Sequence, residues 1–319
     1  MNRREVIKNI GIGSAVLGVA GLSACSSEGS AEKTTEKSPN PKKRVMRIAH
    51  VTDVHVQPER NAPKGFEKCL HHIQDLVDPV DVIFNGGDSI MDALKQDRQR
   101  VEAQWDLWHK IVKSECSLPI EHCIGNHDVW GGGKTSDPIY GKKYAMAEME
   151  LQSPYRSFDR NGWHFIVLDS THQKPNEEWY TAKLDETQFE WLKEDLNKTP
   201  KNTPILVFSH IPIMCAAAFF DGQNEKSGNW EIPGAWVHID ARRIVELFYE
   251  YPNVKTCISG HIHLVDEVVY NNVSYLCNGA VCGAWWKGVY HQTDAGYAVI
   301  NLYDDGSFDR EYVSYGWKV

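Results

Sequence analysis

Short apolar runs that end in polar side chains recur along the chain from Val45 onward. Six such runs have the length and composition of central β-strands that are covered on both faces. They read VMRIAHVTDVH, VDVIFNGGDS, IEHCIGNHD, WHFIVLDS, TPILVFSH and VKTCISGHIH. In each run, aspartate, asparagine or histidine follows the apolar residues at once, so we expect these polar groups at the strand ends.

Apolar residues at helical spacing separate several of the runs. Further helices are expected over residues 187–196 and 240–250, the latter with Asp240 as its N-cap. Strands that alternate with helices predict an α/β architecture, in which ligands gather at the C-terminal ends of the strands. The helical spacing is marked by Phe66, Leu70, Ile73 and Val77 and by Val101, Trp105, Trp108 and Val112.

The last fifty residues follow a different pattern. Asn271-Asn272 and Asp305-Gly306 each separate two β-rich runs, and both pairs are typical of hairpin turns. We therefore expect a second, more antiparallel sheet in this part of the chain. Residues 45–319 contain no internal repeat and no further boundary, and we predict that they form one domain.

The N-terminal residues have the features of an export signal. Arg3-Arg4 precede the apolar residues 10–24, a stretch that is short for a membrane span and typical of a signal peptide. The arginine pair resembles a twin-arginine signal, and Leu22-Ser23-Ala24-Cys25 resembles a bacterial lipobox. We predict a signal peptide over residues 1–25 and a flexible tether over residues 26–44.

In such signals the cysteine becomes the lipidated first residue of the mature protein. Cys25 would then anchor the protein to a bacterial membrane, on its periplasmic or cell-surface side. The alternative is a buried N-terminal helix with a chance cysteine. Seven further cysteines occur without a Cys-x-x-Cys pair, so disulfides are possible in an exported protein but their pairing cannot be deduced.

The charge is distributed unevenly along the 319 residues. Residues 1–44 hold eight Lys or Arg against four Asp or Glu, so the net charge of −9 for the chain leaves −13 on residues 45–319. This acidic domain argues against long nucleic acid as a partner. A small phosphorylated substrate remains compatible if bound cations reverse the local field.

The polar strand-end residues are of the types that bind divalent metals. One ion takes three or four protein ligands, so seven candidates suit two ions, especially if a carboxylate bridges them. Histidine and carboxylate without thiolate favour Mn, Fe, Zn or Co. Residues i and i+2 of an extended segment face the same side, so each Asp-x-His or His-x-His pair could face one pocket. The candidates are Asp53, His55, Asp88, Asn126, His210, His261 and His263.

Five blocks in this order resemble the calcineurin-like metallophosphoesterase family. They span about 210 residues and read Asp53-Val54-His55, Gly87-Asp88, Gly125-Asn126-His127-Asp128, His210 and Gly260-His261-Ile262-His263. The resemblance implies a four-layer αββα sandwich of two mixed β-sheets flanked by helices, with two divalent metal ions at the strand ends.

The resemblance also implies a role for each residue of these blocks. Asp88 would bridge the two ions, His127 would act on the substrate, and Asp128 would orient the His127 ring. A hydroxide bridging the ions would attack phosphorus, and His127 would protonate the leaving oxygen. The first ion would be bound by Asp53, His55 and His263, and the second by Asn126, His210 and His261.

The same resemblance disfavours one branch of the family but does not choose among the others. Purple acid phosphatases carry a tyrosine ligand three residues after the bridging aspartate, where this chain has Met91. Bacterial cyclic-nucleotide phosphodiesterases and many broader phosphoesterases share the Asp-x-His form. We expect a phosphodiesterase, with a phosphomonoesterase as the alternative and a catalytically idle, surface-tethered binding module as the third hypothesis.

Two stretches are candidates for binding a small phosphorylated substrate. Residues 211–238 follow His210 without clear periodicity, and a long loop in that place is often functional. Residues 283–288 read GAWWKG. Trp285 and Trp286 could stack on a base or sugar and Lys287 could meet a phosphate, whereas the alternative is that both tryptophans pack at a sheet edge. Asp169 is a candidate either to support the site or to form a turn.

Overall fold

The computed structural model describes residues 41–176 and 178–319. The predicted signal peptide, the candidate lipidation site Cys25 and most of the predicted tether lie outside these residues. One compact unit comprises Lys42–Val319, and its first strand begins at Arg44, one residue before the predicted boundary. None of the helices in the described part of the chain is both long and apolar enough to span a membrane.

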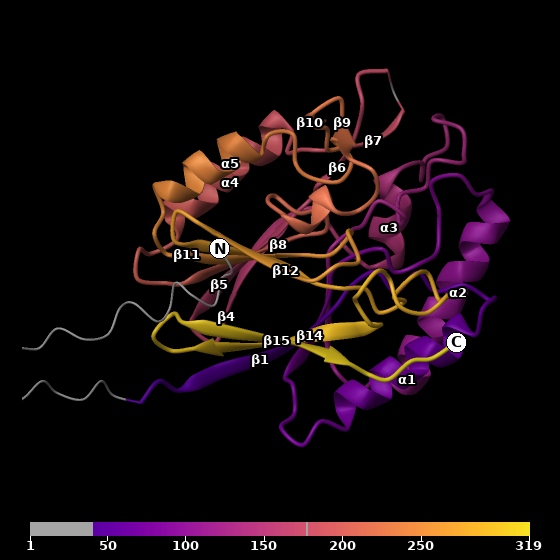
Figure 1. The fold of residues 1–319 in the computed structure, drawn as a ribbon, viewed down its shortest axis with the longest axis horizontal. Helices are drawn as coiled ribbons and strands as arrows, with labels where there is room; N and C mark the ends of the chain where they lie inside the picture. Colours follow the sequence, from indigo (N-terminus) through magenta and orange to yellow (C-terminus); the bar gives the residue numbers. More distant parts are fainter. Residues whose placement is uncertain (1–40, 177) are drawn as a thin grey trace, which may run out of the picture. The chain divides into compact units, whose positions relative to one another are not determined.

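Two mixed β-sheets form the centre of this unit (Figure 1). The first contains β1 (Arg44–Val51), β2 (Val82–Asn85), β3 (Ile120–His122), β14 (Gly296–Tyr303) and β15 (Phe308–Ser314) in the order β15-β14-β1-β2-β3. The second contains β4 (Arg156–Arg160), β5 (Trp163–Leu168), β8 (Ile205–Ser209), β11 (Val254–Ser259), β12 (Asp266–Tyr270) and β13 (Val273–Cys277) in the order β12-β13-β11-β8-β5-β4. Strands β1, β2 and β3 are parallel, as are β13, β11, β8 and β5, and the remaining strands add antiparallel edges.

Among the described residues, five α-helices accompany the sheets, and four of them were expected from the sequence. They are α1 (Ala62–Gln74), α2 (Arg98–Glu115), α3 (Lys142–Glu148), α4 (Glu186–Lys198) and α5 (Ala241–Tyr249), with one 3-10 turn, η2 (Ala217–Phe219). Two short hairpins, β6 (Thr171–Gln173) with β7 (Trp179–Ala182) and β9 (Glu225–Lys226) with β10 (Asn229–Trp230), complete the elements.

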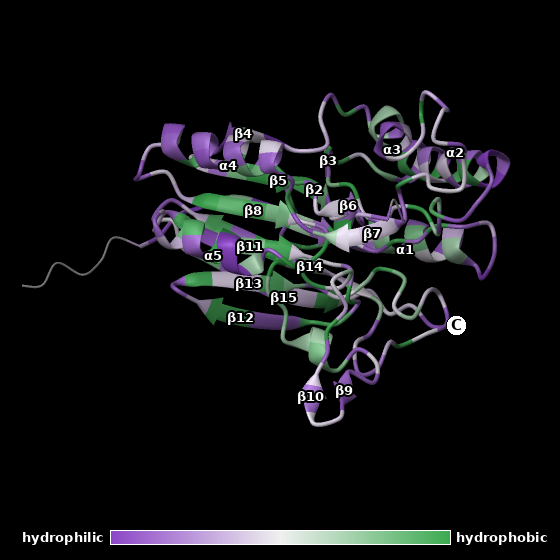
Figure 2. Ribbon diagram, turned by 90° about the horizontal axis from the view of Figure 1, so that it is seen from above, coloured by the Kyte–Doolittle hydropathy of each residue, from purple (hydrophilic) through white to green (hydrophobic). Residues whose placement is uncertain are grey.

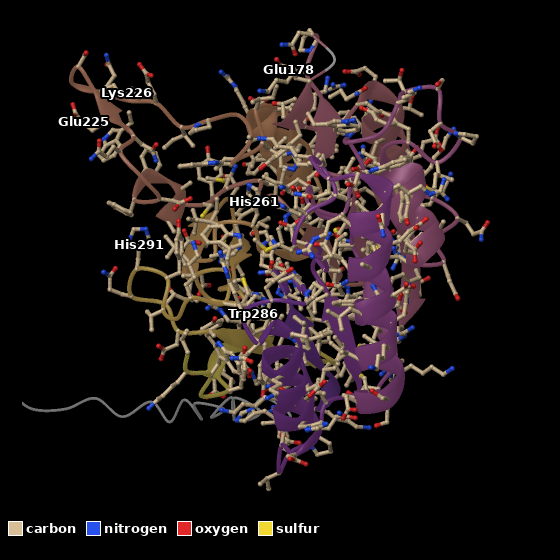
Figure 3. All side chains as sticks on the ribbon, turned by 90° about the vertical axis from the view of Figure 1, so that its right-hand side faces the viewer. Glu178, Glu225, Lys226, His261, Trp286 and His291 are labelled. Atoms are coloured by element: carbon tan, nitrogen blue, oxygen red, sulfur yellow. The ribbon has the colours of Figure 1, made fainter. Side chains whose placement is uncertain are left out.

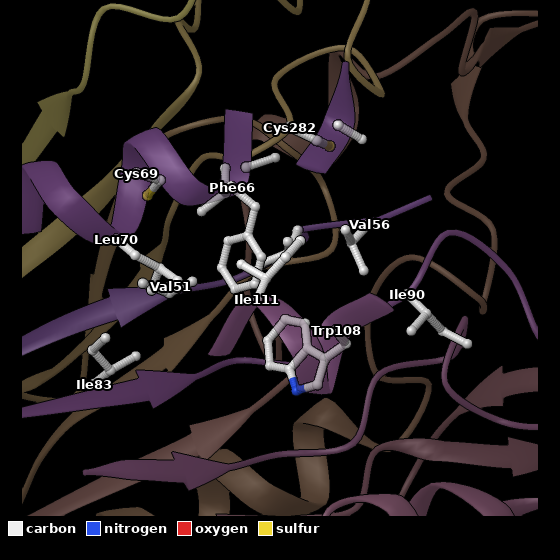
Figure 4. Packing of buried hydrophobic residues seen from close by; sticks show 14 of the residues in the cluster. Val51, Val56, Phe66, Cys69, Leu70, Ile83, Ile90, Trp108, Ile111 and Cys282 are labelled. Atoms are coloured by element: carbon white, nitrogen blue, oxygen red, sulfur yellow. The ribbon is translucent and has the colours of Figure 1, made fainter. Parts of the chain in front are cut away.

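Alternate residues of the strands face two different hydrophobic clusters, which produces four layers. Ile48 of the first sheet packs between the sheets, where the Phe84 and Phe208 rings stack at 4.3 Å. Val51 of the same strand faces Phe66 and the other apolar residues of α1 and α2 instead (Figure 4). A third cluster joins the second sheet to α4 and α5. The order of layers is therefore α–β–β–α, as predicted.

Hydropathy follows the same layering. Strands β8 and β11 are largely hydrophobic along their length, whereas α4 carries many hydrophilic residues (Figure 2). Asp97 caps α2 and Asp185 caps α4, each through a side-chain oxygen that accepts a backbone N–H. Asp240 occupies the N-cap position of α5 but accepts its hydrogen bond from Leu184 N, so the predicted capping bond is absent.

The two C-terminal hairpins form as predicted but do not share a sheet. Asn271 and Asn272 have φ of 50° and 64°, the left-handed values that a two-residue hairpin turn requires. Strands β12 and β13 extend the second sheet, while β14 and β15 close the first sheet against β1. The expected separate antiparallel sheet is therefore wrong, because each hairpin covers the open edge of a different parallel sheet.

Candidate metal centre

The parallel strands of both sheets end at one place, and all seven predicted ligands meet there. Asp88 lies between two groups of residues. Its Oδ2 is 3.5 Å from His55 Nε2 on one side and 3.3 Å from His210 Nε2 on the other. This central position matches the bridging position proposed for Asp88.

Each side of Asp88 contains the partners that the sequence assigned to it. On the first side, His263 Nε2 lies 3.4 Å from Asp53 Oδ1 and 3.3 Å from His55 Nε2. On the second side, His210 Nε2 lies 3.1 Å from Asn126 Oδ1, and the rings of His210 and His261 are 5.1 Å apart. Asp88, His210 and His261 also form one of the side-chain groups that are close enough to hold an ion.

The four histidines share one kind of backbone contact. Each places one ring nitrogen near a backbone carbonyl, which can only accept a hydrogen bond, so that nitrogen carries the proton and the other is free to bind a cation. Such carbonyl contacts are typical of metal-binding histidines. The pairs are His55 Nδ1 with Met91 O (3.4 Å), His210 Nδ1 with Gly86 O (2.9 Å), His261 Nε2 with Ala235 O (3.0 Å) and His263 Nδ1 with Gly283 O (2.7 Å).

The backbone at the centre is strained. Five of the seven predicted ligands have φ in the left-handed region, which side-chain-bearing residues rarely adopt and which clusters at functional sites. The values are 53° for Asp53, 47° for His55, 54° for Asp88, 71° for His261 and 61° for His263. The Asp-x-His and His-x-His pairs therefore do not reach one pocket by lying on an extended strand, as expected from their spacing. The paired residues lie in the loops beyond the strand ends, where the left-handed backbone turns both side chains of a pair toward the centre.

Glycines make the close approach of these loops possible. A Cβ at Gly125 would overlap the Asp88 carboxylate, and one at Gly260 would overlap the Asp53 carboxylate. The glycines that precede Asn126 and His261 in the sequence blocks are thus required by packing between loops that come from different strands.

The electrostatics of the centre favour a bound cation. Burial opposes the ionised form of Asp53, but the neighbouring His263 holds the pKa of Asp53 below its usual value. Burial also opposes a charged His210, yet Asp88 raises the pKa of His210 to about 9. Burial lowers the pKa of His55 and His261 to about 3.

Buried carboxylates thus draw protons onto neighbouring histidines, and a divalent ion could supply that positive charge instead. Asp53 Oδ1 is buried and has no hydrogen-bond partner among the described residues. An orphaned carboxylate oxygen beside oriented imidazoles fits a metal ligand, so the donor set is suited to the two ions predicted from the sequence.

His127 lies at the mouth of the centre. Its side chain is 30% exposed, and its ring lies 4.8 Å from that of His55. The His127 backbone N–H donates to Asp88 Oδ1 at 2.8 Å. The Nδ1 atom faces Asp92, 3.5 Å from its Oδ1. Burial opposes the charged form of His127, but the nearby carboxylates of Asp88 and Asp92 raise its pKa.

The orienting role expected of Asp128 is wrong. Its Oδ2 accepts the backbone N–H groups of Asp88 and Gly125, both at 2.9 Å, and its Oδ1 accepts that of Ser89 at 2.8 Å. The carboxylate therefore joins two ligand-bearing loops, and the acid that faces the His127 ring is Asp92. The resemblance implied the wrong partner, because the Asp128 side chain turns toward the backbone.

A cavity of about 380 Å³ opens beside the centre. Trp285 lines it, with its ring 4.4 Å from that of His263. Trp286 is 1% exposed, donates its indole N–H to His55 O and packs against Trp317, so it is a core residue (Figure 3). Lys287 is exposed and is not among the residues that line the cavity. The predicted substrate contacts of Trp286 and Lys287 are therefore not supported, and consecutive left-handed backbone at 285 and 286 sends the two indoles in different directions.

Several cavity residues were not identified from the sequence. Asp221 and Trp236 lie in the long loop 211–238, which was singled out only as a whole, and Tyr180 and Tyr290 gave no signal at all. Asp169 does not belong to the centre. It pairs with Lys142, and its Oδ1 accepts the Thr171 backbone N–H, so it stabilises a turn.

In comparisons with known proteins, the matching family model and the two relatives described next are all phosphoesterases. The family model described as calcineurin-like phosphoesterase matches residues 46–265. A 3′,5′-cyclic-nucleotide phosphodiesterase of Nostoc sp. is 22% identical over 82% of this chain and 89% of its own length. The 3′,5′-cyclic adenosine monophosphate phosphodiesterase CpdA of Haemophilus influenzae is 23% identical over 84% of this chain and 90% of its own.

Solved structures agree on the fold. A dimetal phosphatase of Danio rerio superimposes with a TM-score of 0.64 at 14% identity, covering 86% of this chain and 97% of the other. The Plasmodium protein GAP50, described as the anchor in the inner membrane complex, gives a TM-score of 0.52 at 15% identity, covering 86% of each chain. At these identities the likeness concerns the fold alone.

Proposed function

Because the chain belongs to the calcineurin-like phosphoesterase family, we propose that its metal centre hydrolyses phosphodiesters. The protein is a dimetal phosphoesterase, and the proposal concerns the preferred ester and the role of each residue. Asp53, His55 and His263 would hold one ion, Asn126, His210 and His261 the other, and Asp88 would contact both. Two divalent ions bound there would supply Lewis acidity and would neutralise charge on the phosphoryl oxygens.

His127 is proposed as the proton donor to the leaving oxygen. Its Nδ1 faces Asp92, which leaves Nε2 as the atom that can reach a substrate in the cavity. As the bond between phosphorus and the leaving oxygen breaks, the proton moves from Nε2 to that oxygen, and water supplies the new oxygen on phosphorus. Asp92 acts as a positioning residue, since its charge stabilises the imidazolium and fixes the ring.

One observation supports the proposed preference for diesters. The described residues that line the cavity include no lysine or arginine, whereas they do include Asp221. Arg60 donates to Trp285 O nearby but is not part of the lining. A monoester brings close to two negative charges and a diester only one, so a cavity without added cations is better suited to the diester. The cyclic-nucleotide esters named for the two relatives are diesters as well.

The test compares two chromogenic substrates that share a leaving group. Metal-free protein is reconstituted separately with Mn²⁺, Fe²⁺, Zn²⁺ and Co²⁺, the ions that a histidine–carboxylate set favours, and bound metal is counted. We expect two ions per chain and a higher kcat/KM on bis-p-nitrophenyl phosphate than on p-nitrophenyl phosphate. The reverse preference in every metal form would favour the phosphomonoesterase alternative.

We also propose that the protein is exported and anchored to a bacterial membrane. Arg3-Arg4, the apolar residues 10–24 and Cys25 support this proposal, and all lie outside the described residues. Cys25→Ser should abolish metabolic lipid labelling and release the protein from membranes. Replacing both arginines by lysine should block export, and normal export of that variant would indicate the general secretory route instead.

A further inference from the structure

The cavity wall next to the predicted ligand His263 combines aromatic rings with one carboxylate. Trp285, Tyr290 and Trp236 supply the rings, and Asp221 supplies the carboxylate. The Tyr290 hydroxyl donates to Asp221 Oδ1. Trp236 lies beside Gly222, where a Cβ would come within 3.4 Å of its indole, so this ring is adjacent to Asp221. We call these four residues the aromatic wall.

Asp221 forms no ion pair with a Lys, Arg or His in the described part of the chain, and its side chain is bonded to the Tyr290 hydroxyl instead. Tyr290 satisfies one of its oxygens with a neutral hydroxyl and leaves the negative charge uncompensated. An anion near a site that binds phosphate opposes the substrate unless the substrate itself brings a positive charge. The Asp221 carboxylate therefore favours a substrate that carries a positive charge.

The rings favour a compact cation over a flat base. The planes of Trp285 and Tyr290 meet at 85° with their centroids 5.2 Å apart. A nucleobase stacks well on one such face but not on both, whereas a small alkylammonium group can contact several ring faces at once. A perpendicular pair of rings together with a carboxylate that has no cationic partner among the described residues matches the chemistry that binds quaternary ammonium groups.

We propose that the aromatic wall binds an alkylammonium arm of the substrate, so that the preferred diesters are of the phosphocholine type. This proposal rests on the proposed diesterase function of the same site. The phosphoryl group would lie at the metal centre, and the ammonium group would lie against the rings, within reach of the Asp221 charge. The same headgroup occurs in phospholipids and in soluble glycerophosphodiesters.

The test compares two substrates that differ only in charge. p-Nitrophenyl phosphocholine and its neutral isostere, p-nitrophenyl 3,3-dimethylbutyl phosphate, share a leaving group and a shape. We expect the metal-loaded wild-type protein to prefer the choline ester by about tenfold in kcat/KM, a ratio within the range of desolvated cation–π contacts. Asp221→Asn removes the negative charge and keeps the three rings, so it should lower this ratio without abolishing it.

Glu225→Gln is the matched control. It removes the same charge from the same loop, but Glu225 lies in the exposed hairpin β9–β10 and does not line the cavity (Figure 3). The control should keep the wild-type ratio. An equal fall of the ratio in both variants would mean a general field effect and would overturn the assignment of Asp221.

A measurement on the unmodified protein covers the case in which Asp221→Asn does not fold. Tetramethylammonium chloride should inhibit hydrolysis of bis-p-nitrophenyl phosphate competitively, whereas sodium chloride at the same ionic strength should not. Turnover of this diester without discrimination by charge, and without such inhibition, would refute the ammonium site and leave the diesterase function intact. No turnover of any diester would refute the proposed function itself.

Two natural sources of the headgroup can then be separated. Glycerophosphocholine in solution and vesicles of phosphatidylcholine are offered to the same metal-loaded protein, and release of choline or phosphocholine is measured. Hydrolysis of either supports the ammonium site and identifies the source, whereas hydrolysis of neither, with cyclic nucleotides cleaved faster, would overturn it.

Discussion

Replacing Asp128 by asparagine separates a structural role from a catalytic one. The carboxylate is fully buried and accepts backbone N–H groups from the loops that carry Asp88 and Asn126. An asparagine keeps one oxygen and turns the other into an amide, which cannot accept. The N–H groups on that side lose their acceptor, and they face two new donor hydrogens.

The hydrogen bonds set the size of the effect. Oδ2 serves two N–H groups at 2.9 Å, and Oδ1 serves one at 2.8 Å and that of Ile90 at 3.4 Å. Leaving a buried donor unsatisfied costs about 1–3 kcal/mol, so stranding one or two donors should lower the free energy of unfolding by roughly 3 kcal/mol. For a chain of this size each kcal/mol shifts Tm by about 2 °C, giving a fall of about 6 °C. Bound metal should fall as well, because the loops that carry its ligands separate.

Asp92→Asn is the informative comparison. At 3.5 Å, a unit charge on a partly exposed pair is worth about 1–2 kcal/mol, or roughly tenfold in rate. This variant should keep its metal and its Tm, since the asparagine oxygen can still accept from the Leu94 backbone N–H. It should lose about tenfold in kcat on a diester with an alkoxide leaving group. The loss should disappear in a His127→Ala background if Asp92 acts through that ring.

The assays are calorimetric Tm, metal content and kcat on both variants. The structural role of Asp128 would be refuted if Asp128→Asn kept the wild-type Tm and two ions while its kcat fell as in Asp92→Asn. That result would restore the orienting role that the resemblance implied. A fall of Tm and metal content in Asp92→Asn would equally contradict its assignment to His127.

Three further predictions follow from the same geometry. Asp88→Asn should lose metal and roughly 10³-fold in activity, because several kcal/mol of transition-state stabilisation depend on the ions; wild-type turnover with two ions bound would contradict the bridging role. His127→Ala should keep its metal and lose about 10²–10⁴-fold on an alkoxide leaving group but clearly less on p-nitrophenolate; equal losses on both would exclude proton donation. Burial opposes a charged His164, but its contacts with Asp195 (2.9 Å) and Asp159 (2.7 Å) raise its pKa. The contribution of these contacts to the free energy of unfolding is therefore complete below the unfolded pKa of about 6.5. It is lost as pH rises through the pKa of His164 in the folded protein. His164→Gln should therefore destabilise the protein more at pH 5.5 than at pH 9 in urea unfolding, and a gap that widens toward alkaline pH would reverse this reasoning.

The sequence alone determined the parts of this protein that depend on local pattern. Apolar runs located the principal strands, 3.6-residue spacing located α1 and α2, and polar residues directly after the runs supplied the seven predicted ligands that meet at the strand ends. These features were predictable because a buried parallel strand must be apolar along its length and because its C-terminal end opens into a loop.

The tertiary structure decided what depends on residues far apart in the chain. The C-terminal hairpin β14–β15 belongs beside β1, a pairing that no local pattern encodes. Asp92 rather than Asp128 faces His127, because the Asp128 carboxylate accepts backbone N–H groups from two loops that are brought together only in the fold. Trp285 and Trp286 are neighbours in sequence, yet one indole lines the cavity and the other lies in the core. Sequence thus specifies which chemical groups reach the strand ends, and packing between loops decides where each of them points.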